Sequence, residues 1–315
     1  MESLSPFRLA PYFRTRPWGF QDLRPWFDYR TDGEPIGEVW LTGEMCAAET
    51  GPLRGLGLAE ITRRHRTALL GAVAARDFPL LVKILFPREK LSVQVHPDDA
   101  LAQKYGEPRG KTECWYALDA QPGSQVALGI RPGVTAKRVM TAVEDGTLES
   151  LLEMVPVAKG DMIFVDAGTV HAVGPGAVLL ETQQTSDLTY RMYDYGSARE
   201  LHREKASAAM RLTTRAAKVA PRRVDGHAVL IDEKYFHVER WPVRAETARR
   251  LTAPLATVQI LFVTQGRIQI GSRDAGHEPF AVERNQVAVV PAASLEWMLE
   301  GEQDAEVIRI LPARG

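Results

Sequence analysis

The sequence predicts a mainly β protein made of two jelly-roll β-barrel domains with a few peripheral α-helices. Three observations carry this prediction. From residue 79 onward, short apolar runs alternate with turns rich in Gly and Pro, which is the pattern of many short strands. A second β-rich segment occupies residues 229–311. The length of 315 residues fits about two domains, since one domain holds roughly 100 to 200 residues.

The strands of the first domain are expected where a short apolar run is bounded by turn residues such as Pro122-Gly123 and Pro175-Gly176. Many short antiparallel strands of this kind favour a jelly roll. In chain order, the candidate strands are residues 79–86, 92–95, 113–117, 126–130, 162–165, 177–185 and 189–194.

Three stretches repeat their apolar residues at helical spacing instead. They cover residues 58–75, 135–154 and 200–212, and we expect them to decorate the first barrel. The basic, polar residues 213–223 are interpreted as a linker, so the domains are predicted to span residues 1–215 and 216–315. In the second domain, the turn signals of β-hairpins lie at residues 264–267 and 283–286.

Composition excludes several classes of function. Lys plus Arg (39) nearly balance Asp plus Glu (40), so no global field draws in nucleic acid or an anionic membrane. Cys46 and Cys114 stand far apart, which argues against a disulfide scaffold and against a thiolate metal site. No apolar run reaches the roughly 20 residues of a membrane helix or forms a signal peptide. We therefore expect a cytoplasmic protein with a small-molecule partner.

The most informative segment is residues 91–99, where polar and apolar side chains alternate. Alternation along a strand places Ser92, Gln94 and His96 on one face and the valines between them on the other. Three polar side chains turned toward a barrel interior cost stability unless they are paired or ligated. A ligand role is therefore favoured for this face, although a lone His in a β-protein is more often structural.

Two further segments complete a candidate site. In residues 111–115, alternation groups Lys111, Glu113 and Trp115 and turns Cys114 away. Residues 160–171 are predicted as a strand and a tight turn that delivers His171.

Together the segments offer two imidazoles, one carboxylate and one amide oxygen, from His96, His171, Glu113 and Gln94. Such a set suits Zn²⁺ and leaves positions for water or substrate oxygens. Two His and one carboxylate are also the facial triad of non-haem iron enzymes, so ligand types alone leave the metal open.

Several longer motifs resemble, in order, the signature blocks of the type I phosphomannose isomerases, a cupin family. They are residues 16–19 (RPWG), 36–38 (IGE), 83–99 (KILFPREKLSVQVHPDD), 110–116 (GKTECWY), 167–171 (AGTVH) and 181–195 (ETQQTSDLTYRMYDY). The resemblance spans about residues 10–205 and is to the short bacterial members, because the large helical insertion of longer members is missing.

The resemblance implies two cupin domains and a single Zn²⁺ per chain, held by Gln94, His96, Glu113 and His171. It also implies contacts to the sugar or its phosphate from Ser92, Lys83 and Lys111. Arg191 matches the family's active-site arginine, a group that holds a phosphate or stabilises a developing oxyanion. Glu181 falls at the position of a carboxylate that takes part in proton transfer. The catalytic residues implied are Arg191, Glu181 and Lys111.

Two positions depart from the family pattern. Asp166 stands where the second cupin motif usually has Pro, and we expect the ligand geometry to survive this change. Ser197 stands where longer members have a Lys six residues after Arg191. That acid–base role is therefore vacant or falls to Arg199 or His202.

The function expected from the resemblance is interconversion of mannose 6-phosphate and fructose 6-phosphate through a cis-enediolate, with a metal acting as Lewis acid. Two alternatives stay open: an iron-dependent cupin oxygenase, and a sugar-phosphate-binding cupin without catalysis. The second domain carries no pair of His residues at the positions of a cupin metal site and is predicted to be degenerate. Trp18 and Trp115 are expected to pack in the core.

Overall fold

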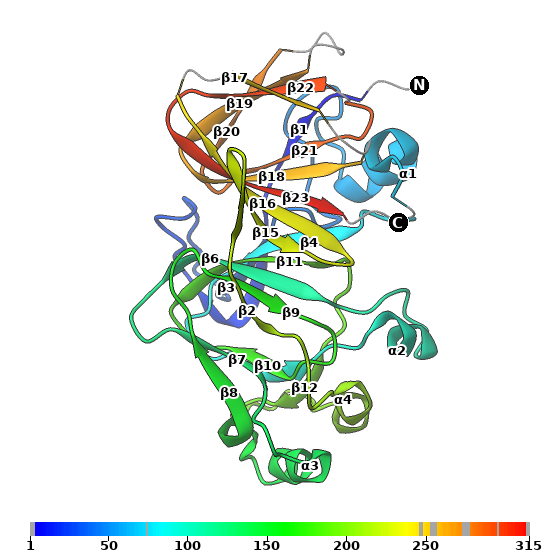
Figure 1. Ribbon diagram of the computed structural model, residues 1–315, viewed down its shortest axis with the longest axis vertical. Coiled ribbons are helices and arrows are strands. Elements are labelled where there is room, and N and C mark those ends of the chain that lie inside the picture. Colours follow the sequence, from blue (N-terminus) through cyan, green and yellow to red (C-terminus); the bar gives the residue numbers. More distant parts are fainter. Residues whose placement is uncertain are drawn as a thin grey trace.

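The computed structural model describes residues 4–73, 75–245, 248–252, 257–272, 278–294 and 296–312. Over these residues the chain forms antiparallel strands in four sheets, with short peripheral helices (Figure 1). The prediction of a mainly β protein with peripheral helices is therefore confirmed. The sheets form a first β unit, in the lower half of Figure 1, and a second β unit in the upper half.

The first β unit pairs a seven-stranded sheet with a five-stranded sheet. The larger sheet has the order β13 (Ala217–Val219), β9 (Met162–Val165), β6 (Glu113–Ala120), β11 (Ala177–Gln184), β4 (Leu80–Leu85), β3 (Ile36–Trp40) and β2 (Tyr12–Phe20). The smaller sheet has the order β12 (Tyr190–Tyr193), β5 (Val93–Val95), β10 (His171–Val173), β7 (Gln125–Ile130) and β8 (Leu152–Pro156).

The second β unit pairs a seven-stranded sheet with a four-stranded sheet. The larger sheet has the order β1 (Phe7–Leu9), β21 (Val287–Val290), β18 (Gln259–Gln265), β23 (Ala305–Pro312), β16 (Phe236–Val243), β15 (His227–Asp232) and β14 (Arg222–Val224). The smaller sheet has the order β17 (Ala248–Thr252), β22 (Glu296–Gly301), β19 (Arg267–Ser272) and β20 (Phe280–Glu283).

Because successive side chains of a strand point to opposite faces, the strands that carry the site contribute to two separate hydrophobic cores. One face of β4 contributes Val82 and Ile84 to a large cluster that also contains Phe236, Phe262 and Ile308 of the second β unit. Each such side chain stabilises the fold by about 1.5–3 kcal/mol relative to an exposed one. This core joins the two seven-stranded sheets and holds the β4, β6 and β11 strands in place.

The opposite strand faces fill the interior of the first β unit. Leu85, Trp115 and Leu179 come from the seven-stranded sheet, and Val126 and Val173 from the five-stranded sheet. The polar residues of the candidate site lie on these same inward faces. The apolar interior therefore fixes the direction in which they point.

Four helices lie within the described ranges: α1 (Leu58–Leu70), α2 (Asp99–Lys104), α3 (Ala136–Glu144) and α4 (Arg203–Ala209). The carboxyl end of α1 bonds to the second β unit, since the amides of Ala292 and Ala293 donate to the carbonyls of Leu69 and Ala68 at 2.9 and 2.8 Å. The helices predicted at 58–75 and 200–212 are confirmed in a shorter form.

The helix predicted at 135–154 is wrong in its second half. The chain leaves α3 at Glu144, makes a short 3₁₀ turn at Leu148–Leu151 and continues as β8. Strand β8 pairs with β7 over Leu152–Pro156, so tertiary pairing overrides a helical spacing of apolar residues.

The turns at 264–267 and 283–286 are present, but the hairpins predicted there are wrong. The strands that flank each turn, β18 and β19 in one case and β20 and β21 in the other, belong to different sheets. Turn residues predict that the chain reverses direction, but they do not predict that the two flanking strands pair with each other. The linker predicted at 213–223 contains β13 and part of β14.

Strand pairing crosses the boundary that the sequence predicts at residue 215. Strand β1 pairs with β21 of the second β unit, and β13 pairs with β9 of the first. The first strand of each predicted domain thus joins a sheet of the other β unit, and Figure 1 shows β1 beside β21. The division into domains 1–215 and 216–315 stays a prediction.

Candidate active site

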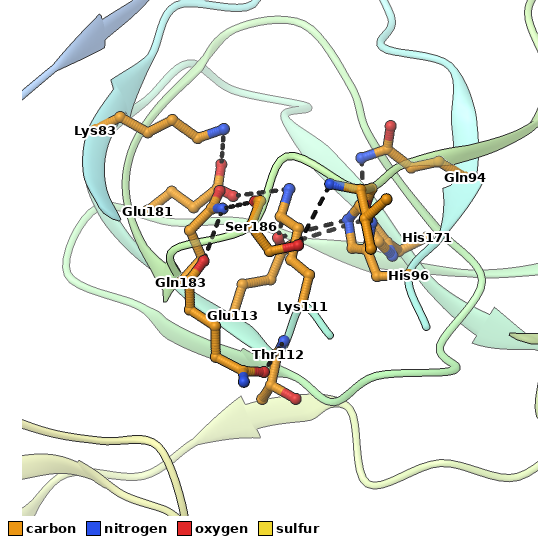
Figure 2. A network of polar contacts seen from close by, with 12 residues as sticks. Lys83, Gln94, His96, Lys111, Thr112, Glu113, His171, Glu181, Gln183 and Ser186 are labelled. Carbon is orange, nitrogen blue, oxygen red and sulfur yellow. Dashed lines mark hydrogen bonds and ion pairs between the residues drawn. The ribbon is translucent and has the colours of Figure 1, made fainter. Parts of the chain in front are cut away.

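A polar cavity of about 410 Å³ lies in the first β unit and receives side chains from both of its sheets. Its lining includes Arg16, Trp18, Glu38, Lys83, Ser92, Gln94, Lys111, Glu113, Trp115, Glu181, Asp187, Arg191 and Arg199. Figure 2 shows the innermost of these residues around the imidazoles of His96 and His171. The structure therefore brings together all of the site residues that the sequence predicts.

Strand register explains why these side chains meet. In the seven-stranded sheet, Glu181 of β11 lies opposite Lys83 of β4. In the five-stranded sheet, Gln94 of β5 lies opposite His171 on one side and Arg191 on the other. Side chains at paired positions share a face, so each sheet presents its polar residues to the same interior.

The imidazoles of His96 and His171 converge on the carboxylate of Glu113. The distances are 3.6 Å from His96 Nε2 to Glu113 Oε2 and 3.3 Å from His171 Nε2 to Glu113 Oε1. One possible ligand atom from each residue lies within 4.8 Å of the others, and all three residues are buried. Gln94 reaches the same point, with its Nε2 3.2 Å from His171 Nε2.

The backbone orients both imidazoles. His96 Nδ1 lies 2.7 Å from the Leu188 carbonyl and His171 Nδ1 lies 2.9 Å from the Thr169 carbonyl. A carbonyl accepts only, so both Nδ1 atoms carry the proton and both Nε2 atoms offer a lone pair to the cavity. Metal-binding His residues in proteins are commonly fixed in this way, by donating the N–H that faces away from the metal to a backbone carbonyl.

Burial keeps these imidazoles neutral. Burial, reinforced by the charge of Lys111, holds the pKa of His96 well below its usual range, and burial lowers the pKa of His171 to about 4. His96 Nε2 is buried and makes no hydrogen bond, which is costly for a polar atom unless a ligand occupies the lone pair. Two neutral imidazoles and a carboxylate are ligands that suit a borderline divalent metal, and such an ion would also provide a partner for His96 Nε2.

A tight turn carries His171 into the site. Gly168 has φ +91°, and a Cβ there would lie 2.8 Å from the Arg211 side chain, so glycine is required. Asp166, which departs from the family pattern, accepts a hydrogen bond from the Thr169 hydroxyl at 2.9 Å. The turn is thus closed by a carboxylate.

Charges of alternating sign continue from the imidazoles along the cavity wall (Figure 2). Lys111 Nζ lies 3.1 Å from Glu113 Oε2 and 3.5 Å from Glu181 Oε1. Lys83 Nζ lies 3.4 Å from Glu181 Oε2 and 3.7 Å from Glu38 Oε1. All five side chains are buried, and each has an opposite charge beside it. Such pairing offsets part of the cost of removing the charges from water.

Glu181 is a carboxylate of this row whose pKa lies near neutrality. Burial raises its pKa to about 7, although Lys83 opposes the rise, and the nearby Glu113 adds to it. Burial alone lowers the pKa of Lys111, but Glu113 and Glu181 outweigh burial and raise it. Near neutral pH, Glu181 can hold or release a proton beside a permanent cation.

Arginines mark the rim of the cavity. Arg191 donates through Nη1 to the Glu200 carbonyl at 2.9 Å, and its Nε is buried without a hydrogen bond. Arg199 holds the buried Asp194 through two contacts of 2.6 and 2.8 Å. Ser92 lies nearby, with its hydroxyl 3.5 Å from Gln94 Oε1.

Sequence reasoning assigned no role to Arg16, Glu38 or Asp187, all of which line the cavity, and named Arg199 only for a vacant acid–base role. In the sequence, Arg16 and Glu38 stand out only as members of the short motifs RPWG and IGE. Asp187 lies inside another motif, where nothing but its position in the fold marks it out. Trp18 and Trp115 are buried in the core as expected, and they also line the cavity.

Taken together, the fold and the site define a protein of two antiparallel β units with a candidate metal centre in the first. A family model described as phosphomannose isomerase type I, catalytic domain, matches residues 7–130. The mannose-6-phosphate isomerase of Streptococcus mutans is 33% identical over 316 residues, covering 96% of this chain and 97% of that protein. Mannose-6-phosphate isomerase ManA of Bacillus subtilis is 32% identical, covering 94% of this chain and 96% of that protein.

Solved structures agree with the sequence relatives. The crystal structure of mannose 6-phosphate isomerase from Bacillus subtilis has a TM-score of 0.85 and 30% identity, and the match covers 98% of this chain and 99% of that one. The chain therefore belongs to the type I phosphomannose isomerase family. It is an isomerase, and the predicted cupin-type fold is confirmed by this match. No helix in the described part of the chain has the length and hydropathy to cross a membrane.

Proposed function

We propose that the cavity interconverts mannose 6-phosphate and fructose 6-phosphate; two of the chain's relatives are named mannose-6-phosphate isomerases. One observation carries the proposal: His96, Glu113 and His171 converge, in a polar cavity, beside a carboxylate with a pKa near neutrality and two buried lysines. Moving a proton between neighbouring carbons needs an acid–base group, and the charge that develops needs cations. Both kinds of group stand here.

One Zn²⁺ per chain is assigned to Gln94, His96, Glu113 and His171. The donor set is that of a borderline metal, and the unpartnered His96 Nε2 supports it. In the structure, the Nε2 of Gln94 lies beside His171. Flipping the side-chain amide would place its Oε1 there instead, and the amide oxygen could then bind the metal. A divalent ion held there supplies Lewis-acid polarisation of substrate oxygens.

Glu181 is assigned the role of the acid–base group that carries the proton between C2 and C1 of the sugar. Its pKa of about 7 allows it to accept that proton and return it near neutral pH. Lys111 Nζ lies 3.5 Å from Glu181 Oε1 and remains charged, so it stabilises negative charge on the cis-enediolate.

Lys83, Ser92, Lys111 and Arg191 are assigned to the phosphate and the sugar oxygens. The lysines lie 3.1–3.4 Å from buried carboxylates, whereas the Nε of Arg191 makes no hydrogen bond and its nearest ion-pair partner, Asp194 Oδ2, lies 4.0 Å away. A guanidinium binds phosphate strongly, and it keeps its charge at any physiological pH. Arg191 is therefore the anchor of this set, and contacts remote from C1 and C2 position the reacting carbons.

Residues 1–215 are proposed as the catalytic domain and residues 216–315 as a degenerate cupin domain without metal ligands. The enzyme is proposed to act in the cytoplasm, since Cys46 and Cys114 are both buried and form no disulfide. A sugar phosphate is its small-molecule partner.

The test is a coupled assay of fructose 6-phosphate formation from mannose 6-phosphate. Protein is stripped with a chelator and reloaded separately with Zn²⁺ or Fe²⁺, and metal content is measured beside turnover. Turnover that returns with Zn²⁺ supports the proposal. A fully loaded site that turns over no mannose 6-phosphate with either metal contradicts it, and dioxygen consumption with Fe²⁺ would point to an oxygenase instead.

A further inference from the structure

A buried carboxylate in the cavity wall, Glu38 of β3, has no part in the roles assigned above. Only 6% of Glu38 is exposed. Arg16 grips it with two parallel contacts, Nε to Oε1 and Nη2 to Oε2, each 3.0 Å long. The indole of Trp40 donates a third hydrogen bond to Oε2 at 2.8 Å. The orientation of this carboxylate is therefore fixed from two sides.

An irregularity in β2 brings Arg16 to this position. Thr15 and Phe20 both pair with Ile36 of β3, so the four residues between them loop out of the ladder. Gly19 closes the loop, because a Cβ there would lie 2.2 Å from the backbone of Ile36. The loop turns Arg16 toward the cavity, where it lies beside the substrate-binding groups.

Glu38 faces Lys83 across the cavity wall. Their charged atoms lie 3.7 Å apart, and Lys83 also lies 3.4 Å from Glu181, so the ammonium is held between two carboxylates. Lysine has a flexible stem and a charge without direction, so its place depends on the anions around it. Without Glu38, the ammonium would have Glu181 as its only anionic neighbour among the ion pairs of the described residues.

We infer that Glu38, clamped by Arg16, is a positioning residue that holds the Lys83 ammonium at the cavity wall where the sugar phosphate binds. The inference rests on the proposed function, since it requires Lys83 to contact the substrate. Glu38 is suited to this task because it stays ionised: burial raises its pKa, but Lys83 and Arg16 outweigh burial and lower it to about 2.

The second β unit provides a matched control. Glu239 is also buried, and it accepts from the indole two residues on, Trp241, at 2.6 Å and from Arg309 at 3.1 Å. Glu239 does not line the cavity, so Glu239→Gln removes the same kind of buried ion pair outside the proposed substrate site.

The experiment measures kcat and KM for mannose 6-phosphate with Zn²⁺-loaded wild type, Glu38→Gln and Glu239→Gln. We expect Glu38→Gln to lower kcat/KM by on the order of 10- to 100-fold, mostly through KM, because a displaced group costs about that much. Zn²⁺ content should stay at the wild-type level. Glu239→Gln should leave KM unchanged. Arg16→Gln, which leaves Glu38 in place but unclamped, should raise KM in the same direction and serves if Glu38→Gln fails to fold.

A double-mutant cycle separates positioning from a structural role. If Glu38 acts through Lys83, then Glu38→Gln should change kcat/KM by less than about two-fold in a Lys83→Met background. Independent, multiplicative losses in the double variant would overturn the inference, and so would a wild-type KM in both Glu38→Gln and Arg16→Gln. An inactive wild type would instead overturn the proposed function, on which the inference depends.

Discussion

Glu113→Gln tests the candidate metal centre most directly, because it removes the single formal negative charge among Gln94, His96, Glu113 and His171. Two unit charges about 4 Å apart in a partly shielded site interact by about 4 kcal/mol. A divalent cation beside Glu113 would lose at least that much attraction. Lys111, whose Nζ lies 3.1 Å from Glu113 Oε2, would also lose this counter-charge and repel the cation. Since about 1.4 kcal/mol corresponds to ten-fold in affinity, we expect a loss of about three orders of magnitude or more.

The assay is competition for Zn²⁺ between the stripped protein and a chromophoric chelator of known affinity. Metal content after gel filtration is a second readout, and Glu239→Gln is the control for loss of a buried carboxylate elsewhere. Turnover of mannose 6-phosphate should fall together with bound metal. A Glu113→Gln protein that binds Zn²⁺ within about ten-fold of the wild-type affinity would show that Glu113 is not a ligand.

Three further outcomes are expected. Arg191→Ala should lower kcat/KM for mannose 6-phosphate by roughly 10- to 100-fold, because a hydrogen bond to a charged group contributes about 1.5–3 kcal/mol; unchanged kinetics would exclude Arg191 as the anchor. Burial raises the pKa of Glu239, but the hydrogen bond from His237 and the charge of Arg309 outweigh it and lower the pKa from 4.5 to about 2. Its ionised form therefore stabilises the fold above pH 4.5, and this contribution is lost as the pH falls toward 2. Glu239→Gln should cost about 3 kcal/mol at pH 7 and progressively less between pH 4.5 and pH 2 in urea unfolding, whereas a constant difference would contradict this. Gly168→Ala should destabilise the protein by about 1–3 kcal/mol and weaken Zn²⁺ binding, read by unfolding and chelator competition, because its φ of +91° suits only glycine.

Strand alternation is the part of the site that the sequence predicts best. It turns Cys114 into the core between the large sheets and Trp115 toward the cavity, as expected. Strand β9 has the predicted bounds, Met162–Val165. A two-residue period is a local property of the chain, so the face on which a side chain lies can be predicted without knowing the partner strand.

Pairing between distant strands could not be predicted in the same way. Residues 152–154 look helical from the spacing of their apolar side chains, yet they belong to β8 and pair with β7. The looped-out residues 16–19 carry no local signal that Thr15 and Phe20 share one partner. The roles of Arg16 and Glu38 were missed for this reason, because their contact depends on a register between two strands.

The row of alternating charges would allow a chain with a net charge of −1 to hold the proposed divalent cation and sugar phosphate in one cavity. From the loop inward, Arg16 and Lys83 alternate with Glu38 and Glu181, and Lys111 then stands before Glu113. A buried charge is costly unless an opposite charge lies beside it, so each member of the row depends on the presence of its neighbours. Against burial, Lys83 and Arg16 lower the pKa of Glu38 to about 2, whereas burial and the nearby Glu113 raise the pKa of Glu181 to about 7 in spite of its two lysine neighbours. Two carboxylates that contact the same lysine thus differ in role because their other neighbours differ. A single substitution in the row should therefore change the behaviour of the next member as well as its own.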